Sequence, residues 1–113
     1  MSREELREQI LKAEPSNPSA EVVMHKAITN RLRQIYIDKN ADYGDSVHDT
    51  FKKYGLISFL VRMEDKLNRL KSLTEKEGEV PRVNESIEDT LLDLSNYAIL
   101  ALIEVYKERS ERK

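Results

Sequence analysis

Four polar side chains near the C-terminus share one face of an otherwise apolar segment. Glu85, Asp89, Asp93 and Asn96 follow one another at intervals of three or four residues. On a helix with about 100° between residues, they fall within roughly 80° of one another. Like charges one turn apart destabilise a helix by about 0.2–0.5 kcal/mol, so this row needs a neutralising partner. Mg²⁺ is one candidate, because it prefers carboxylate oxygens as ligands.

A second polar row lies in the segment from about residue 56 to 72. Glu64 is central to an apolar face that Ile57, Leu60, Val61 and Leu67 form at helical spacing. A face of this kind is normally covered by another helix. We therefore expect Glu64 to meet the acidic row across a pair of packed helices.

The two rows together predict a metal site. Glu64, Asp89 and Asp93 are the expected Mg²⁺ ligands, and Glu64 and Glu85 are the expected catalytic groups. A cation held there would bridge to phosphate oxygens and orient an attacking water. The alternative is an interior ionic network with no metal, in which the carboxylates are satisfied by nearby cationic and phenolic groups, namely Arg62, Arg69, Lys71 and Tyr97.

The stretch "NADYGDS", residues 40–46, is expected to be a loop between two helices, the first of which ends at Lys39 and Asn40. Gly44 would let the backbone approach a ligand closely, and Ser46 would open the next helix with free amide groups, so an anion could bind there. The alternative is a connection whose Gly and Asn serve backbone geometry alone. The expected substrate-binding residues of the whole chain are Lys39, Asn40, Asp42, Tyr43, Arg62, Lys66, Arg69 and Asn96.

Composition limits the function classes. The chain of 113 residues fits one domain, and 39% hydrophobic with 35% charged residues is typical of a globular protein. A net charge of −2 gives no bulk basic field for duplex nucleic acid. The absence of cysteine excludes disulfides and thiolate metal sites. No segment is typical of a signal peptide or a membrane span, so we expect a cytoplasmic protein of a cell or a phage-infected host.

Helical periodicity and only 3 Gly and 3 Pro predict an all-α fold. We expect a helical bundle of three long helices plus one or two short helices. Residues 1–16 would form a peripheral N-terminal helix opened by Ser2 and Glu5, a capping-box spacing, and residues 17–113 a single helical domain. Gly55 is expected to end a short helix.

Three motifs carry a family resemblance: "KNADYGDS", "EDKLNR" and "ESIEDTLLDLSNY". Over roughly residues 27–104 the chain resembles the type 1 nucleotide modification associated domain family, whose members occur in bacteria and phages. The resemblance implies a link to making or processing modified nucleotides. The chain is also distantly similar to all-α NTP pyrophosphatases of the MazG and dimeric dUTPase type. That similarity implies Mg²⁺ ligands at Glu64, Asp89 and Asp93, release of pyrophosphate and a homo-oligomer.

The sequence is therefore consistent with two functions. The first is a nucleotide-processing or nucleotide-binding protein, resembling a Mg²⁺-dependent NTP pyrophosphohydrolase, with a small-molecule nucleotide as its partner. The second is a non-catalytic helical interaction protein that dimerises through apolar helices. For neither function do we expect a membrane or duplex nucleic acid as a partner.

Overall fold

The computed structural model describes the backbone of residues 1–43, 46–75 and 83–111, and the side chains of residues 1–39, 46–75 and 87–111. Every regular element in these ranges is a helix, which confirms the predicted all-α bundle of three long and two short helices. The helices are α1 (Arg3–Leu11), α2 (Ala20–Tyr43), α3 (Ser46–Tyr54), α4 (Ile57–Glu75) and α5 (Val83–Glu111). None of these described helices is both long and apolar enough to span a membrane.

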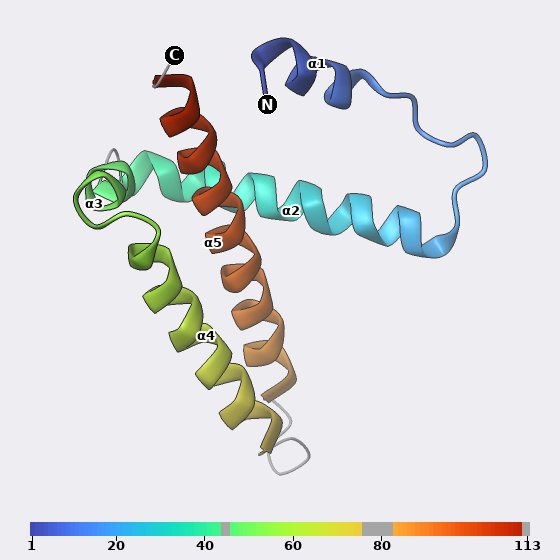
Figure 1. The fold of residues 1–113 in the computed structure, drawn as a ribbon. Coiled ribbons are helices and arrows are strands. Elements are labelled where there is room, and N and C mark those ends of the chain that lie inside the picture. The colour runs from blue at the N-terminus through green and yellow to red at the C-terminus, as the bar shows by residue number, and fades with distance from the viewer. Residues whose placement is uncertain (44–45, 76–82, 112–113) are drawn as a thin grey trace.

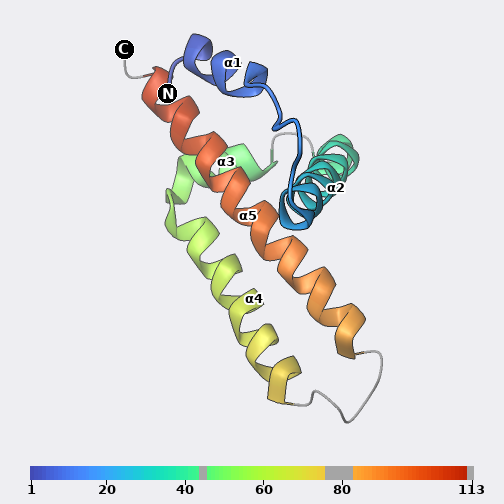
Figure 2. The same cartoon turned by 90° about the vertical axis from the view of Figure 1, so that its right-hand side faces the viewer.

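The helices form an antiparallel pair with a third long helix across it. In Figure 1, α4 and α5 run side by side in opposite directions, and most long-range packing is between them. Figure 2 shows α2 passing on the side of α5 away from α4. Short α3 links the C-terminal end of α2 to the start of α4. The C-terminal half of α2, the start of α3, and the middle of α4 and α5 thus meet at one corner.

The turn between α3 and α4 brings two phenylalanine rings together. Among the described residues, they are the only pair of aromatic rings in contact. Gly55 has a φ of +72°, and its N–H donates to the Phe51 carbonyl at 2.7 Å, so it ends α3 as predicted. The chain then reverses into α4, bringing the rings of Phe51 and Phe59 to a centroid separation of 6.0 Å. Phe59 is 1% exposed. The turn therefore fixes which side of α4 packs inward.

Two local expectations are corrected. The stretch at residues 40–43 is the last turn of α2 and not a loop, because the helix continues to Tyr43. The face of α4 with Ile57, Leu60, Val61 and Leu67 is exposed within the chain, each residue by more than half of its surface. The physical reason is that α4 is apolar on several sides, and the Phe59 side is the one turned onto its neighbours.

The N-terminal helix α1 is capped at its start and has an exposed surface. The Ser2 hydroxyl accepts a hydrogen bond from the Glu5 N–H at 3.1 Å, as the capping-box spacing predicted. No residue of α1 is buried, and Ile10 and Leu11 are 80% and 81% exposed. The division into a peripheral part at residues 1–16 and a domain at 17–113 stays a prediction.

The core of the single chain is small. Among the side chains that the structure describes, the buried apolar ones are Leu32, Phe51, Phe59 and Leu92. The radius of gyration is 16.9 Å, whereas a compact domain of this length has about 13 Å. The accessible surface is 9181 Å², against about 6,400 Å² for a typical monomer of the same mass. The chain therefore folds as an open arrangement with several uncovered apolar faces.

Candidate functional site

The corner where four helices meet contains a pocket of about 440 Å³. This volume is within the range of small-molecule sites, roughly 300–1,000 Å³. Its polar lining comprises Tyr36, Lys39, Ser46, His48, Arg62, Asp93, Asn96, Tyr97, Glu104 and Lys107, and its apolar lining Ile35, Val47, Leu100 and Ile103. A mixed lining of this kind offers charged groups for one part of a ligand and an apolar floor for another.

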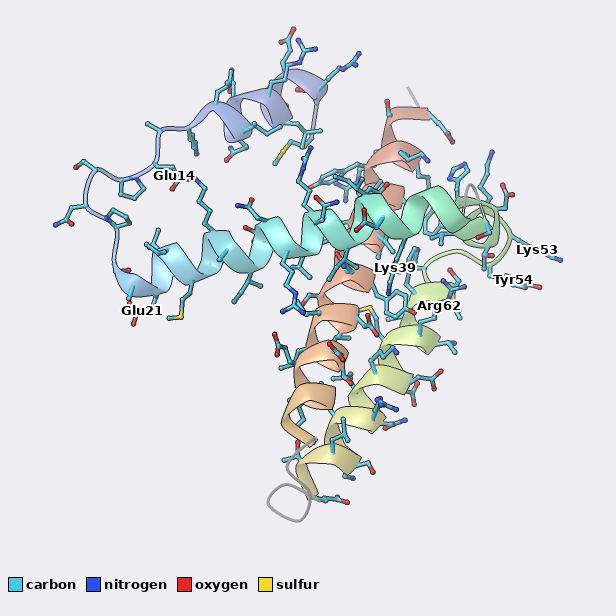
Figure 3. The ribbon with its side chains drawn as sticks, turned by 180° about the vertical axis from the view of Figure 1, so that it is seen from behind. Glu14, Glu21, Lys39, Lys53, Tyr54 and Arg62 are labelled. Atoms are coloured by element: carbon cyan, nitrogen blue, oxygen red, sulfur yellow. The ribbon has the colours of Figure 1, made fainter. Side chains whose placement is uncertain are left out.

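Three cationic side chains reach the pocket from three different helices. Lys39 comes from α2, Arg62 from α4 and Lys107 from α5. Figure 3 shows Lys39 and Arg62 in the same corner, where α2 crosses the α4–α5 pair. Arg62 is half-buried, and no ion pair or hydrogen bond joins its guanidinium to another described residue. The fold thus places this cation at the pocket.

Asp93 is neutralised by lysines from two neighbouring helices. Its carboxylate lies 3.2 Å from Lys66 Nζ on α4 and 3.6 Å from Lys39 Nζ on α2. The Asp93 side chain is 34% exposed, so water screens these contacts and each contributes modestly to stability. Their main effect is geometric, because they hold Lys39 and Lys66 beside Asp93, which lines the pocket.

A second charged group lies at the α3 side of the pocket. His48 Nδ1 is 2.6 Å from Glu104 Oε2, although the residues are 56 positions apart in the chain. Lys107 Nζ is 3.6 Å from the other carboxylate oxygen of Glu104 and 3.3 Å from His48 Nδ1. Glu104 is 6% exposed, so its charge is held in place by these two partners.

The pocket brings together four of the residues expected from the sequence: Lys39, Arg62, Asp93 and Asn96. Lys66 adjoins them through Asp93. Arg69 instead donates from Nε to the hydroxyl of buried Thr90 at 3.3 Å, which ties α4 to α5. Four further side chains were expected at the site but lie outside the side chains that the structure describes: Asn40, Asp42, Tyr43 and Glu85.

The expected metal ligands do not converge. Glu64 and Asp89 are exposed and do not line the pocket, whereas Asp93 does. Among the side chains described, no three His, Cys, Asp or Glu residues are placed so that they could hold a metal ion. The described residues alone therefore do not fit the predicted Mg²⁺ site. Because Glu85 is outside them, Mg²⁺ binding stays a prediction.

Sequence reasoning missed the α3 side of the pocket, namely His48, Glu104 and Lys107. A signal was present in α5, where Asp93, Asn96, Leu100, Glu104 and Lys107 continue one row at spacings of three or four residues. The predicted acidic row could have been extended toward the C-terminus along this line. His48 carries no such periodic signal, because its partner comes from a distant segment.

Comparison with known proteins bears on most of the residues of this corner. No curated protein and no solved structure matches the chain significantly, and the distant similarity to MazG-type pyrophosphatases is not confirmed. The family described as nucleotide modification associated domain 1 matches residues 39–105. This range begins at the pocket lysine of α2 and includes Arg62, Asp93 and Glu104. The match covers more than half of the sequence, and the chain therefore belongs to the nucleotide modification associated domain 1 family.

Proposed function

We propose that the pocket binds a nucleotide through its phosphate groups. The observation that carries the proposal is the convergence of Lys39, Arg62 and Lys107 from three helices on one cavity. Only two carboxylates, Asp93 and Glu104, line the same cavity, so the described lining has an excess of positive charge. The family membership supports a link to nucleotide metabolism, and phosphate is the anionic group that all nucleotides share.

Arg62 is the expected principal phosphate ligand. Its planar guanidinium can donate two parallel hydrogen bonds to phosphate oxygens, and such charge-assisted bonds are stronger than neutral ones. Lys39 can exchange its long 3.6 Å contact with Asp93 for a phosphate oxygen. The first residues of α3, Ser46 and Val47, also line the pocket, which adds the positive end of that helix.

The remainder of the lining suits a nucleoside. Tyr36 and Tyr97 are half-buried and present aromatic surface, while Leu100 and Ile103 provide an apolar floor. The Asn96 amide can both donate and accept, which is the property needed to read the polar edge of a base. The proposed orientation therefore places the base against Asn96 and the apolar floor, and the phosphates toward the cations Lys39, Arg62 and Lys107.

Calorimetric titration with the four deoxynucleoside triphosphates tests this proposal. We expect binding to the wild type and a loss of about 10–100-fold in affinity for Arg62→Ala, the equivalent of one charge-assisted hydrogen-bonding group. Arg33→Ala is the matched control, because Arg33 is exposed on α2 and does not line the pocket. Absence of nucleotide binding by the wild type, or equal loss in both variants, would contradict the proposal.

A second proposal concerns assembly: we infer that two copies of the chain associate through their exposed apolar faces. The outer face of α4 exposes Ile57, Leu60, Val61 and Leu67, and the protruding half of α2 exposes Met24 and Ile28 among others. The chain exposes about 2,800 Å² more than a compact monomer of its mass. A stable dimer interface buries about 1,200–2,000 Å² in total, or roughly 600–1,000 Å² from each copy, so the uncovered surface is large enough to seat a second copy.

Sedimentation equilibrium of the wild type and of Val61→Glu tests the assembly. We expect a dimer for the wild type and a monomer for Val61→Glu, because a charge would be buried at the interface. Ser72→Glu adds the same charge at an exposed polar position further along α4 and should leave the dimer intact. A monomeric wild type at micromolar concentration would rule out the second copy as the covering partner.

A further inference from the structure

The pair formed by His48 and Glu104 has the geometry of an acid–base group that phosphate binding alone does not require. The Nδ1 to Oε2 distance is 2.6 Å, and both side chains line the pocket. Glu104 is almost fully buried, whereas the His48 side chain is 24% exposed. A buried carboxylate thus holds an imidazole that remains accessible to a ligand.

The hydrogen-bonding capacities of the neighbours decide which ring nitrogen is protonated. A carboxylate only accepts hydrogen bonds, so Nδ1 carries the hydrogen that is donated to Glu104. Lys107 also only donates, and its 3.3 Å approach to Nδ1 is therefore a contact secondary to its ion pair with Glu104. With Nδ1–H held by Glu104, the lone pair of the neutral ring is on Nε2. No hydrogen bond joins Nε2 to any residue in the described part of the chain.

We propose that His48, positioned by Glu104, acts as a general base in hydrolysis of a phosphoanhydride bond of the bound nucleotide. Nε2 takes a proton from a water molecule as the water oxygen forms a bond to phosphorus. The bridging P–O bond breaks, and its electron pair stays on the leaving phosphate, whose added negative charge Lys39 and Arg62 stabilise. The proton then passes from Nε2 to solvent. This inference rests on the proposed nucleotide binding.

The positions of the charged groups fit these separate roles in phosphate binding and proton transfer. Lys39 and Arg62 approach from α2 and α4, and the His48–Glu104 pair comes from α3 and α5, all lining one cavity. A nucleotide held by the cations would therefore have a base available within the same pocket. Glu104 acts through His48 and is a positioning residue in this scheme, since it fixes the tautomer and the orientation of the ring.

The test measures binding and turnover separately on the full chain. Phosphate and pyrophosphate release from the four deoxynucleoside triphosphates is followed for the wild type and for His48→Gln, and affinity is measured by calorimetry. We expect His48→Gln to lose turnover by about 10²–10⁴-fold, the usual contribution of a general base, while its nucleotide Kd changes by less than about threefold. His25→Gln is the matched control, because His25 is exposed and outside the pocket.

Two further measurements separate chemistry from folding. Exogenous imidazole should restore turnover to His48→Ala, which a merely destabilised protein would not show. Glu104→Gln should lower kcat without raising KM, because it releases the ring, leaves Lys39 and Arg62 in place and frees Lys107 from its ion pair.

Wild-type binding without release of phosphate or pyrophosphate would overturn this inference and leave the binding proposal standing. So would turnover by a folded His48→Gln equal to that of the wild type. If the wild type binds no nucleotide, the binding proposal fails and the general-base inference fails with it.

Discussion

Lys66 on α4 and Asp93 on α5 form an ion pair of 3.2 Å at the edge of the pocket, and Lys39 from α2 approaches the same carboxylate at 3.6 Å. One carboxylate thus links three helices and holds two cations beside a cavity. For the proposed phosphate binding, this arrangement gives Asp93 a role opposite to that expected of a metal ligand. Asp93 lowers the positive charge of the pocket and would compete with a bound phosphate for the lysines.

Replacing Asp93 with Asn should therefore strengthen nucleotide binding. Removal of the carboxylate frees Lys39 and Lys66, and the gain should be about two- to fivefold in Kd, the scale of a partly exposed ion pair. Calorimetric titration with dATP compares Asp93→Asn with Asp89→Asn, an exposed carboxylate one turn away that does not line the pocket. A large loss of affinity in Asp93→Asn alone would favour the Mg²⁺ site over direct binding by cations.

Removal of divalent cations gives an independent measurement. If Lys39, Arg62 and Lys107 bind phosphate directly, the Kd for a deoxynucleoside triphosphate should change less than about threefold between buffers with EDTA and with Mg²⁺. A nucleoside monophosphate, which chelates Mg²⁺ weakly, is the control ligand. Loss of triphosphate binding in EDTA, with monophosphate binding unchanged, would support the predicted magnesium site.

Phe59 should dominate the stability of the corner. It is 1% exposed and packs near Phe51, so Phe59→Ala should lower the free energy of unfolding by about 3–5 kcal/mol. Tyr54→Ala is the matched aromatic truncation, since Tyr54 is 60% exposed at the end of α3, and it should cost less than about 1 kcal/mol. Urea unfolding monitored by circular dichroism compares the two. Similar losses would mean that the aromatic cluster does not anchor α3 to α4.

Substitution of Gly55 should lower the stability of the fold because of its backbone conformation, and not because a new side chain would be crowded. A Cβ at this position would meet no heavy atom within 4 Å, but the φ of +72° is strained for residues other than glycine. Gly55→Ala should lower the unfolding free energy by about 1–2 kcal/mol. Gly55→Asn should lose less, because Asn tolerates the left-handed region. Thermal melts of both variants provide the measurement, and equal losses would assign the cost to something other than φ.

The sequence by itself determined the helices and the family. Apolar spacing, scarce glycine and proline, and the stop at Gly55 depend on contacts within a few residues, so they could be read from the chain. The same local logic identified Arg62, Asp93 and Asn96, because their spacing on α4 and α5 puts them on definite helix faces. It was wrong at residues 40–43, where Asn and Asp suggested a loop but α2 continues.

Only the tertiary structure decided which faces meet. Apolar residues occur on several sides of α4, so periodicity did not distinguish the Phe59 side, which packs, from the Ile57 and Val61 side, which is exposed. For this reason Glu64 was expected in the interior and lies outside. His48 and Glu104 are 56 positions apart, and their 2.6 Å contact depends on how α3 is set against α5. Local sequence patterns do not encode that packing, because contacts among four helices together determine it.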